Sequence, residues 1–428
     1  MPGQQAFGGA LRRPGTPSLL RELNDRAALR LLLDGRQLTR SQLSELTGVS
    51  KVTVAQMLAR LEERGLVTAA GELAGGRGPN ATLYAAVPSS AYVAGLYVEQ
   101  GLLNTAVADV TGKVIAEVRE DTNGALEPIG LLRSAVDRVC AAAGISVDRL
   151  SAFVIGSPGV VDPRTGDPWL TINLPEWHRG VLAGLRSALR RPVVIENDVN
   201  LAAIAEQAVG AAVGVDDFVL LWVGVGVGLA TVLGGRLHRG MAGAAGEIGW
   251  LPVPGAPVAS NVRVPSGGGL QSLAGAGPVR RLAAEHGLDD TTAGAAVRAA
   301  VAALTSRSSR STPSSLTDDG GSPVSTAPAS ADAVARAAAF LDELARRIAL
   351  GATAVCAVLD PGLVVLGGET GQAGGEALAS RVAENVAAMS PFPPRVVATG
   401  VASEPVLRGA LLTAVDQARA DLLASVAE

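Results

Sequence analysis

Residues 193–200, Val-Val-Ile-Glu-Asn-Asp-Val-Asn, join a short apolar run to a cluster of polar side chains. The three residues that open this stretch are β-branched, which is typical of a buried strand. The polar side chains that follow are those of Glu196, Asn197, Asp198 and Asn200. Capping of one helix needs fewer polar groups than this. The pattern therefore favours a ligand site at the end of a strand, with capping of the next helix as the alternative.

Four more glycine-rich or polar segments lie on both sides of this stretch. They are residues 156–162 (GSPGVVD), 173–177 (NLPEW), 223–228 (VGVGVG) and 243–249 (GAAGEIG). Strand-like runs alternate with alanine-rich helical stretches between about residues 125 and 300, which predicts an α/β architecture. A single short glycine motif has little specificity, but five such segments in one order are specific.

The composition is that of a globular protein with more than one core. The chain has 428 residues, 48% of them apolar, and this length predicts two or three domains. No uninterrupted apolar run reaches the ~18 residues of a membrane span, and no secretion signal is expected at the start. Cys140 and Cys356 lie in apolar contexts and are expected to be buried free thiols. These features predict a cytoplasmic protein.

A capping box, a turn and an N-cap predict a helix-turn-helix near the start of the chain. Thr39 and Gln42 fit a capping box at the start of a first helix, in which Leu43 and Leu46 are expected to face inward. Ser50 is the expected N-cap of a second helix, which extends to about residue 64. That helix carries an apolar stripe at helical spacing, formed by Val54, Met57, Leu58 and Leu61.

The polar face of the second helix and the glycine-rich wing after it predict contacts with duplex DNA. The N-terminal part of such a helix can reach base edges, where Gln56 suits adenine and Val52 suits a thymine methyl group. Arg77, at the tip of the wing, is expected to reach a minor groove. The expected DNA-binding residues are Arg40, Ser50, Lys51, Val52, Thr53, Gln56, Arg60 and Arg77. A solvated helical hairpin without a nucleic-acid partner is the alternative.

The charge of the chain is unevenly distributed. Residues 1–90 contain 11 basic and 7 acidic side chains, whereas the remainder contains 25 basic and 33 acidic ones. A basic head on an acidic body is consistent with a head that binds nucleic acid.

Together with the head, the five segments resemble the ROK family (repressors, open reading frames, kinases) over residues 18–426. Within the family the chain is most similar to the branch of xylose and N-acetylglucosamine repressors. The resemblance implies an N-terminal winged helix-turn-helix and an α/β, actin-like (ribonuclease H-like) domain of the sugar-kinase type, with a sugar cleft between two lobes. It implies sugar-binding roles for Asn173, Asn197, Asp198, Glu247, Trp250 and Gln271. Trp250 is expected either to stack on a sugar or to fill the core.

The chain departs from the kinases of this family where they hold phosphates. Those kinases have an Asp followed by a Gly-Gly-Thr loop, whereas Tyr97, Glu99 and Gln100 occupy the matching positions here. A carboxylate repels phosphate, and a side chain blocks the backbone approach that glycine permits. We therefore expect no catalytic residue, no ATP-dependent transfer and no cofactor. In a kinase, Asp198 would take the position of the base.

The chain also departs from relatives that hold a structural zinc ion. Trp250 stands at the position of their histidine, and Val262, Val264 and Gly269 align with their cysteines. No tetrahedral zinc site of that kind is therefore expected. Gln271 stands where the relatives have a sugar-binding glutamate.

The sequence predicts the following domains. A flexible N-terminus (1–17) precedes the head (18–88), and the sugar-kinase-like domain covers 91–428. Lobe 1 is expected at about 91–196 plus 405–428, and lobe 2 at about 197–404. Residues 305–331 are rich in Ser, Thr, Pro and Gly and are expected to form a disordered insertion.

The combined features predict a sugar-responsive regulator that represses genes of carbohydrate metabolism. Its expected partners are operator DNA, a sugar or sugar phosphate effector, and further copies of the chain in a homodimer or homotetramer, with no membrane partner. An active sugar kinase with an appended DNA-binding head is the main alternative. A third interpretation is a ligand-independent DNA-binding or scaffold protein whose sugar pocket is vestigial.

Overall fold

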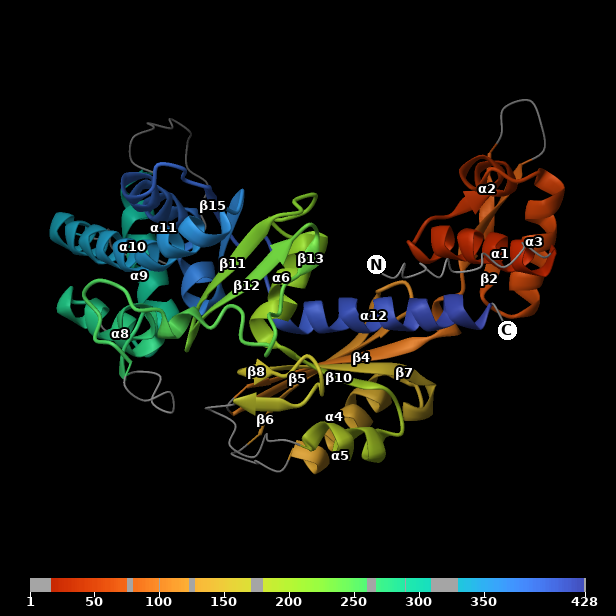
Figure 1. The fold of residues 1–428 in the computed structure, drawn as a ribbon, viewed down its shortest axis with the longest axis horizontal. Coiled ribbons are helices and arrows are strands. Elements are labelled where there is room, and N and C mark those ends of the chain that lie inside the picture. Colours follow the sequence, from red (N-terminus) through yellow and green to blue (C-terminus); the bar gives the residue numbers. More distant parts are fainter. Residues whose placement is uncertain are drawn as a thin grey trace, which may run out of the picture.

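The computed structural model describes residues 17–74, 80–99, 101–122, 128–170, 180–259, 267–288, 290–308 and 330–426. These residues form a head and two α/β lobes, and each of the three parts contains its own sheet (Figure 1). Within these ranges no helix is long and apolar enough to cross a membrane. Arg77, Asn173 and residues 1–16 lie outside the described residues.

The head is a three-helix unit with a small antiparallel sheet of strand order β1-β3-β2. Its elements are α1 (Pro17–Leu33), β1 (Leu38–Thr39), α2 (Arg40–Thr47), α3 (Lys51–Glu63), β2 (Val67–Leu73) and β3 (Ala81–Ala86). The expected capping box is confirmed, because Thr39 and Gln42 bond reciprocally at the start of α2. The Ser50 side chain caps α3 by accepting from the backbone N–H of Thr53.

The apolar stripe of α3 forms the core of the head, and its four residues are buried as expected. In α2, Leu43 is fully buried, but Leu46 is 52% exposed, so the expectation for Leu46 was wrong. The helix ends one residue after Leu46, at Thr47, and the chain turns away at Gly48 with φ 72°. The last turn of α2 is therefore left uncovered.

Lobe 1 is built on a five-stranded sheet of order β10-β7-β4-β5-β6. Its strands are β4 (Tyr92–Glu99), β5 (Leu102–Asp109), β6 (Val114–Asp121), β7 (Leu150–Ser157) and β10 (Val193–Asn197). The helices α4 (Pro128–Ala143) and α5 (Val181–Leu189) lie on one side of the sheet and α12 (Pro405–Ser425) on the other (Figure 1). The short pair β8 (Val160–Val161) and β9 (Pro168–Leu170) follows β7. Cys140 is buried and free as expected, and burial raises its pKa to about 11.

Lobe 2 contains a second five-stranded sheet, of order β13-β12-β11-β14-β15. Its strands are β11 (Phe218–Val223), β12 (Val227–Leu233), β13 (Arg236–Leu237), β14 (Leu363–Gly367) and β15 (Arg395–Ala398). Its helices are α6 (Asp198–Val209), α7 (Gln271–Ala274), α8 (Ala276–Glu285), α9 (Ala293–Ser308), α10 (Ala331–Leu359) and α11 (Gly368–Met389). Cys356 is buried and free in α10, as expected.

The predicted range of the disordered insertion, 305–331, extends too far at both ends. Residues 305–308 are the last turn of α9, because the alanine-rich helix continues into the serine-rich stretch. At the other end, Ser330 caps α10 and Ala331 is its first residue. Residues 309–329 lie outside the described residues.

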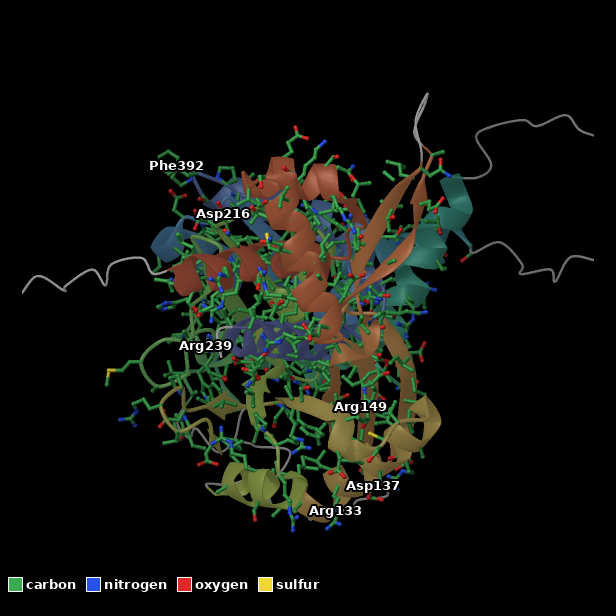
Figure 2. All side chains as sticks on the ribbon, turned by 90° about the vertical axis from the view of Figure 1, so that its right-hand side faces the viewer. Arg133, Asp137, Arg149, Asp216, Arg239 and Phe392 are labelled. Atoms are coloured by element: carbon green, nitrogen blue, oxygen red, sulfur yellow. The ribbon has the colours of Figure 1, made fainter. Side chains whose placement is uncertain are left out.

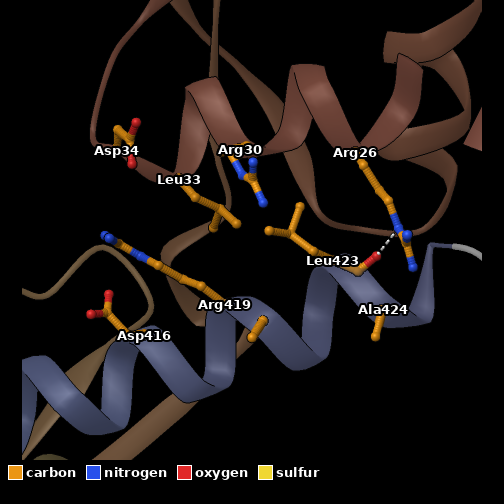
Figure 3. A pocket seen from close by; sticks show the side chains of 9 residues that line it. Arg26, Arg30, Leu33, Asp34, Asp416, Arg419, Leu423 and Ala424 are labelled. Atoms are coloured by element: carbon orange, nitrogen blue, oxygen red, sulfur yellow. Dashed lines mark hydrogen bonds between the residues drawn. The ribbon is translucent and has the colours of Figure 1, made fainter. Parts of the chain in front are cut away.

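The helix α12 connects the lobes with the head. Its last turn contacts the head, where Arg26 donates to the carbonyl of Leu423 at 2.7 Å and Arg64 donates to that of Ser425 at 2.6 Å. These arginines satisfy carbonyls that the end of a helix leaves unpaired, and they complement its partial negative charge. A cavity of about 500 Å³ lies beside this contact, between α1 and α12 (Figure 3).

Candidate functional site

A polar corner forms where β10 ends and α6 begins. The Asn197 side chain caps α6, because its Oδ1 accepts from the backbone N–H of Asn200 at 3.0 Å. Its Nδ2 donates to the carbonyl of Gly159 at 3.0 Å and to Asp198 Oδ1 at 3.1 Å. Asn197 therefore caps α6, and this role does not exclude ligand binding, because its Oδ1 has a second lone pair. The same contacts hold Asp198 at a fixed place beside the turn after β7.

Asp198 has the most unusual ionisation in this corner. Its pKa is raised to about 7, mainly by burial and also by the carboxylates of Glu247 and Glu99, against the lowering effect of the Val199 backbone N–H. Burial also raises the pKa of Glu247. A carboxyl group that titrates near neutrality can accept or share a hydroxyl proton. The pair Asp198 and Glu247 is therefore suited to bind the hydroxyl groups of a sugar.

Glu196 and Arg239 fix the position of this corner. Glu196 is 6% exposed, and its Oε1 accepts from the Asn197 backbone and from Asn200 Nδ2, both at 2.9 Å. Its Oε2 accepts from Arg239 Nε at 2.7 Å. Figure 2 labels Arg239, which follows β13. Arg239 was not predicted from the sequence, although a carboxylate at the end of a buried strand indicates that a cation is needed.

Two glycines allow the loop that carries Glu247 to lie against the sheet. Gly243 has φ 78°, and a Cβ there would lie 1.9 Å from the carbonyl oxygen of Val161. Gly246 has φ 100°, and a Cβ there would lie 1.8 Å from the carbonyl oxygen of Leu229. No larger residue fits either position without moving the backbone. The motif at 243–249 thus brings Glu247 toward Asp198.

Gln271 was expected to bind sugar, but its side chain is already engaged. Its Oε1 accepts from the Val227 backbone at 2.7 Å, and its Nε2 donates to the Val225 carbonyl at 3.1 Å. An amide both donates and accepts, whereas the glutamate of relatives only accepts, so Gln271 can hold the turn between β11 and β12. Trp250 is partly buried, and its indole N–H has no partner among the described residues.

The exposed face of α3 carries most of the expected DNA-binding side chains. Ser50, Lys51 and Gln56 are exposed and Thr53 is partly exposed, while Val52 is 70% exposed. Exposed Arg40 donates to the Tyr84 hydroxyl at 2.5 Å, and its guanidinium lies 5.4 Å from the centre of the Tyr84 ring.

Arg60 forms an ion pair within the head. Its Nε and one terminal nitrogen bond to both oxygens of Asp25, at 2.8 and 2.5 Å. The Asp25 side chain is 9% exposed and that of Arg60 is 36% exposed. This ion pair attaches α3 to α1, a structural role that was not expected, and the DNA contact of Arg60 remains a prediction. Asp25 lies 35 residues earlier, and no local pattern indicates the pairing.

A second cavity lies between the lobes and has a volume of about 270 Å³. Tyr97 and Glu99 line it from lobe 1, and Trp222 and Glu369 line it from lobe 2. Glu404, which precedes α12, completes an acidic wall. Burial raises the pKa of Glu99, and the carboxylates of Glu369 and Glu404 raise it further. The cavity therefore lies beside residues 97–100, which match the phosphate-binding loop of the sugar kinases that the chain resembles.

The winged head and the two lobes define a DNA-binding unit joined to an actin-like domain of the sugar-kinase type. A sequence profile of the ROK family matches residues 98–417, and a winged helix-turn-helix DNA-binding profile matches residues 21–68. The chain belongs to the ROK family. The resemblance and the fold class inferred from the sequence are therefore confirmed.

Relatives of this chain include named regulators. A xylose repressor of Caldicellulosiruptor bescii is 28% identical over 244 residues, which cover 55% of this chain and 60% of the relative. The DNA-binding transcriptional dual regulator NagC of Escherichia coli is 25% identical over 249 residues, which cover 57% and 61%. The matches thus span about three fifths of each relative.

Solved structures share the fold. A ROK family transcriptional regulator, a homolog of the Escherichia coli MLC protein, aligns with a TM-score of 0.68 at 18% identity, covering 95% of this chain and 99% of its own. A ROK hexokinase from Thermus thermophilus aligns with a TM-score of 0.56 at 26% identity, covering 77% of this chain and 99% of its own.

Proposed function

We propose that this chain is a sugar-responsive transcriptional repressor of carbohydrate metabolism that acts in the cytoplasm, where the DNA is. The observation that carries this proposal is the exposed N-terminal part of α3, with Lys51, Val52 and Gln56, on a winged head that contacts α12. Relatives named as xylose repressor and NagC support the same function.

The effector is a sugar or a sugar phosphate in the polar corner. Asn197, Asp198 and Glu247 bind its hydroxyl groups, and the sequence predicts the same role for Asn173, which lies outside the described residues. Binding favours one arrangement of the lobes, and α12 passes the change to the head. Two or four copies assemble, and two heads bind half-sites about one helical turn, or a multiple of it, apart.

Kinase activity is lost in this proposal because the inter-lobe cavity is acidic. The carboxylates of Glu99, Glu369 and Glu404 line this cavity, which Tyr97 also lines, and the resemblance places the phosphate loop of the kinases at residues 97–100. Like charges a few ångströms apart repel strongly in a poorly hydrated site. A nucleotide polyphosphate is therefore a poor ligand for this cavity.

The test of DNA binding is a fluorescence-anisotropy titration of the DNA upstream of the chain's own gene, over a range of salt concentrations. We expect a specific complex that weakens with salt. Gln56→Ala should reduce discrimination against unrelated DNA by about 1–3 kcal/mol. Gln37→Ala, at an exposed glutamine outside α3, serves as the control. A wild-type chain with no sequence preference at any salt concentration refutes the proposal.

An ATP-dependent sugar kinase is the second candidate, and the pKa of about 7 at Asp198 favours it. A coupled assay of ADP release over a panel of sugars separates the two. Turnover that Asp198→Asn abolishes establishes the kinase. Absence of turnover together with specific operator binding supports the repressor.

A further inference from the structure

The cavity between the lobes has an excess of negative charge. Its lining includes the carboxylates of Glu99, Glu369 and Glu404 and the guanidinium of Arg119. Arg119 lies 3.5 Å from Glu404, and its side chain is 64% exposed. Because this ion pair is exposed to water, it offsets the negative charge of the cavity only weakly. A fourth lining carboxylate, Glu206, accepts from the Thr399 hydroxyl and from nearby backbone N–H groups and is thus satisfied.

Asn104 supplies a hydrogen-bond acceptor that the protein does not use. The residue lines the cavity and is 1% exposed. Its Nδ2 donates to Glu404 Oε2 at 2.6 Å, but its Oδ1 has no partner among the described residues. A buried amide oxygen normally has a hydrogen-bond donor. A ligand N–H or O–H group that reaches this oxygen beside Glu404 would satisfy it.

Two aromatic rings complete the lining of the cavity. Tyr97 lies on β4 and Trp222 on β11, so the rings come from opposite lobes. The faces of such rings attract organic cations. Carboxylates, aromatic faces and an unpaired amide oxygen together match the chemistry of an ammonium group attached to a carbon chain. Among the described residues, no cluster of His, Cys, Asp and Glu is arranged to hold a metal ion.

We propose that this cavity binds a small primary organic ammonium ion as a second ligand, beside the sugar corner. Besides burial, the charges of Glu247 and Glu99 raise the pKa of Asp198 in that corner. The ammonium group lies between Glu99 and Glu369, with an N–H directed at Asn104. A volume of about 270 Å³ admits a molecule of the size of a short diamine. Because Glu99 belongs to lobe 1 and Glu369 to lobe 2, the cation bridges the lobes and relieves the repulsion between them.

The test is a titration of the full chain with putrescine, followed by thermal shift and by tryptophan fluorescence. The neutral 1,4-butanediol has a similar length and similar hydrogen-bonding groups but no charge, and serves as the control ligand. We expect putrescine to raise the melting temperature and to saturate, while butanediol has no effect. Equal responses to both ligands, or no response to putrescine, overturn the proposal.

Charge-neutral variants locate the site. Glu99→Gln and Glu369→Gln should each weaken putrescine binding at least tenfold, whereas Glu384→Gln, at an exposed position of the same helix α11, should bind like the wild type. Each cavity variant removes one of the carboxylates that repel one another in the empty cavity. The variants should therefore fold at least as stably as the wild type. Unchanged affinity in both cavity variants refutes the site. Operator binding is measured separately, so failure here leaves the repressor proposal standing.

Discussion

Asp198 titrates near pH 7 because it is poorly hydrated and faces the carboxylates of Glu247 and Glu99. The folded chain therefore binds a proton there more tightly than the unfolded chain does. A raised pKa contributes stability at low pH, and this contribution is lost as the pH rises from about 4 to about 7.

Asp198→Asn removes this titration. Relative to the wild type, the variant should gain about 1–3 kcal/mol in free energy of unfolding between pH 4.5 and pH 8. Urea denaturation at the two pH values measures the difference. A wild type and a variant that respond equally to pH contradict the assignment of the pKa to Asp198.

Gly246 permits the close approach of its loop to Leu229. Gly246→Ala should destabilise the lobe by more than about 3 kcal/mol and abolish sugar binding, because its Cβ overlaps a backbone carbonyl. Gly255→Ala is the control: φ there is +82°, but nothing lies within 4 Å of the added Cβ. It should cost only the strain of the backbone, about 1 kcal/mol. Equal losses in the two variants contradict the steric argument.

At the level of single residues, the sequence predicted side chains whose role depends on near neighbours. The caps at Thr39 and Ser50 are of this kind, because their partners lie three residues away. The intramolecular contacts of Arg60 and Gln271 were not predicted, because their partners, Asp25 and Val225–Val227, are distant in sequence. The sugar-binding roles of Asn197, Asp198 and Glu247 remain predictions, although the structure brings the three together.

At the level of elements, α3 has one face for the core and one that is exposed, and the ion pair of Arg60 lies at the boundary. The hydrophobic period predicted the helix and its buried stripe. The edges of the serine-rich insertion could not be predicted equally well, because serine and threonine occur both in disordered segments and at helix ends, as Ser330 does when it caps α10.

Arg60→Ala should destabilise the head by about 1–3 kcal/mol, since it leaves the nearly buried carboxylate of Asp25 unpaired. Arg36→Ala, at an exposed position in the same head, should change stability by less than about 0.5 kcal/mol. Thermal unfolding measures both. An Arg60→Ala variant of unaffected stability that loses DNA affinity would support the predicted DNA contact and contradict the structural role.

At the level of the whole molecule, α12 reaches the inter-lobe cavity at one end and the head at the other. Pro405 and Val406 line the cavity, and the carbonyls of Leu423 and Ser425 accept from Arg26 and Arg64 of the head. The sequence assigned residues 405–428 to lobe 1 but did not predict this contact, because arginines that bond to backbone carbonyls leave no pattern in the sequence.

The double variant Arg26→Ala/Arg64→Ala should release the head from α12. We expect a larger radius of gyration in small-angle scattering, and DNA binding that no longer responds to the effector. Arg21→Ala, at an exposed position of α1, is the control and should behave like the wild type. A compact and still responsive double variant contradicts a role of this contact in coupling.

Because α12 is long, a small tilt at the cavity moves its other end, at the head, by several ångströms. A helix of 21 residues is about 31 Å long, so a tilt of about 10° at the cavity displaces its far end by about 5 Å. Successive base pairs are about 3.4 Å apart, so this displacement exceeds one step along the duplex. A rotation small enough to leave both lobes intact is thus sufficient to bring a pair of heads out of phase with their half-sites.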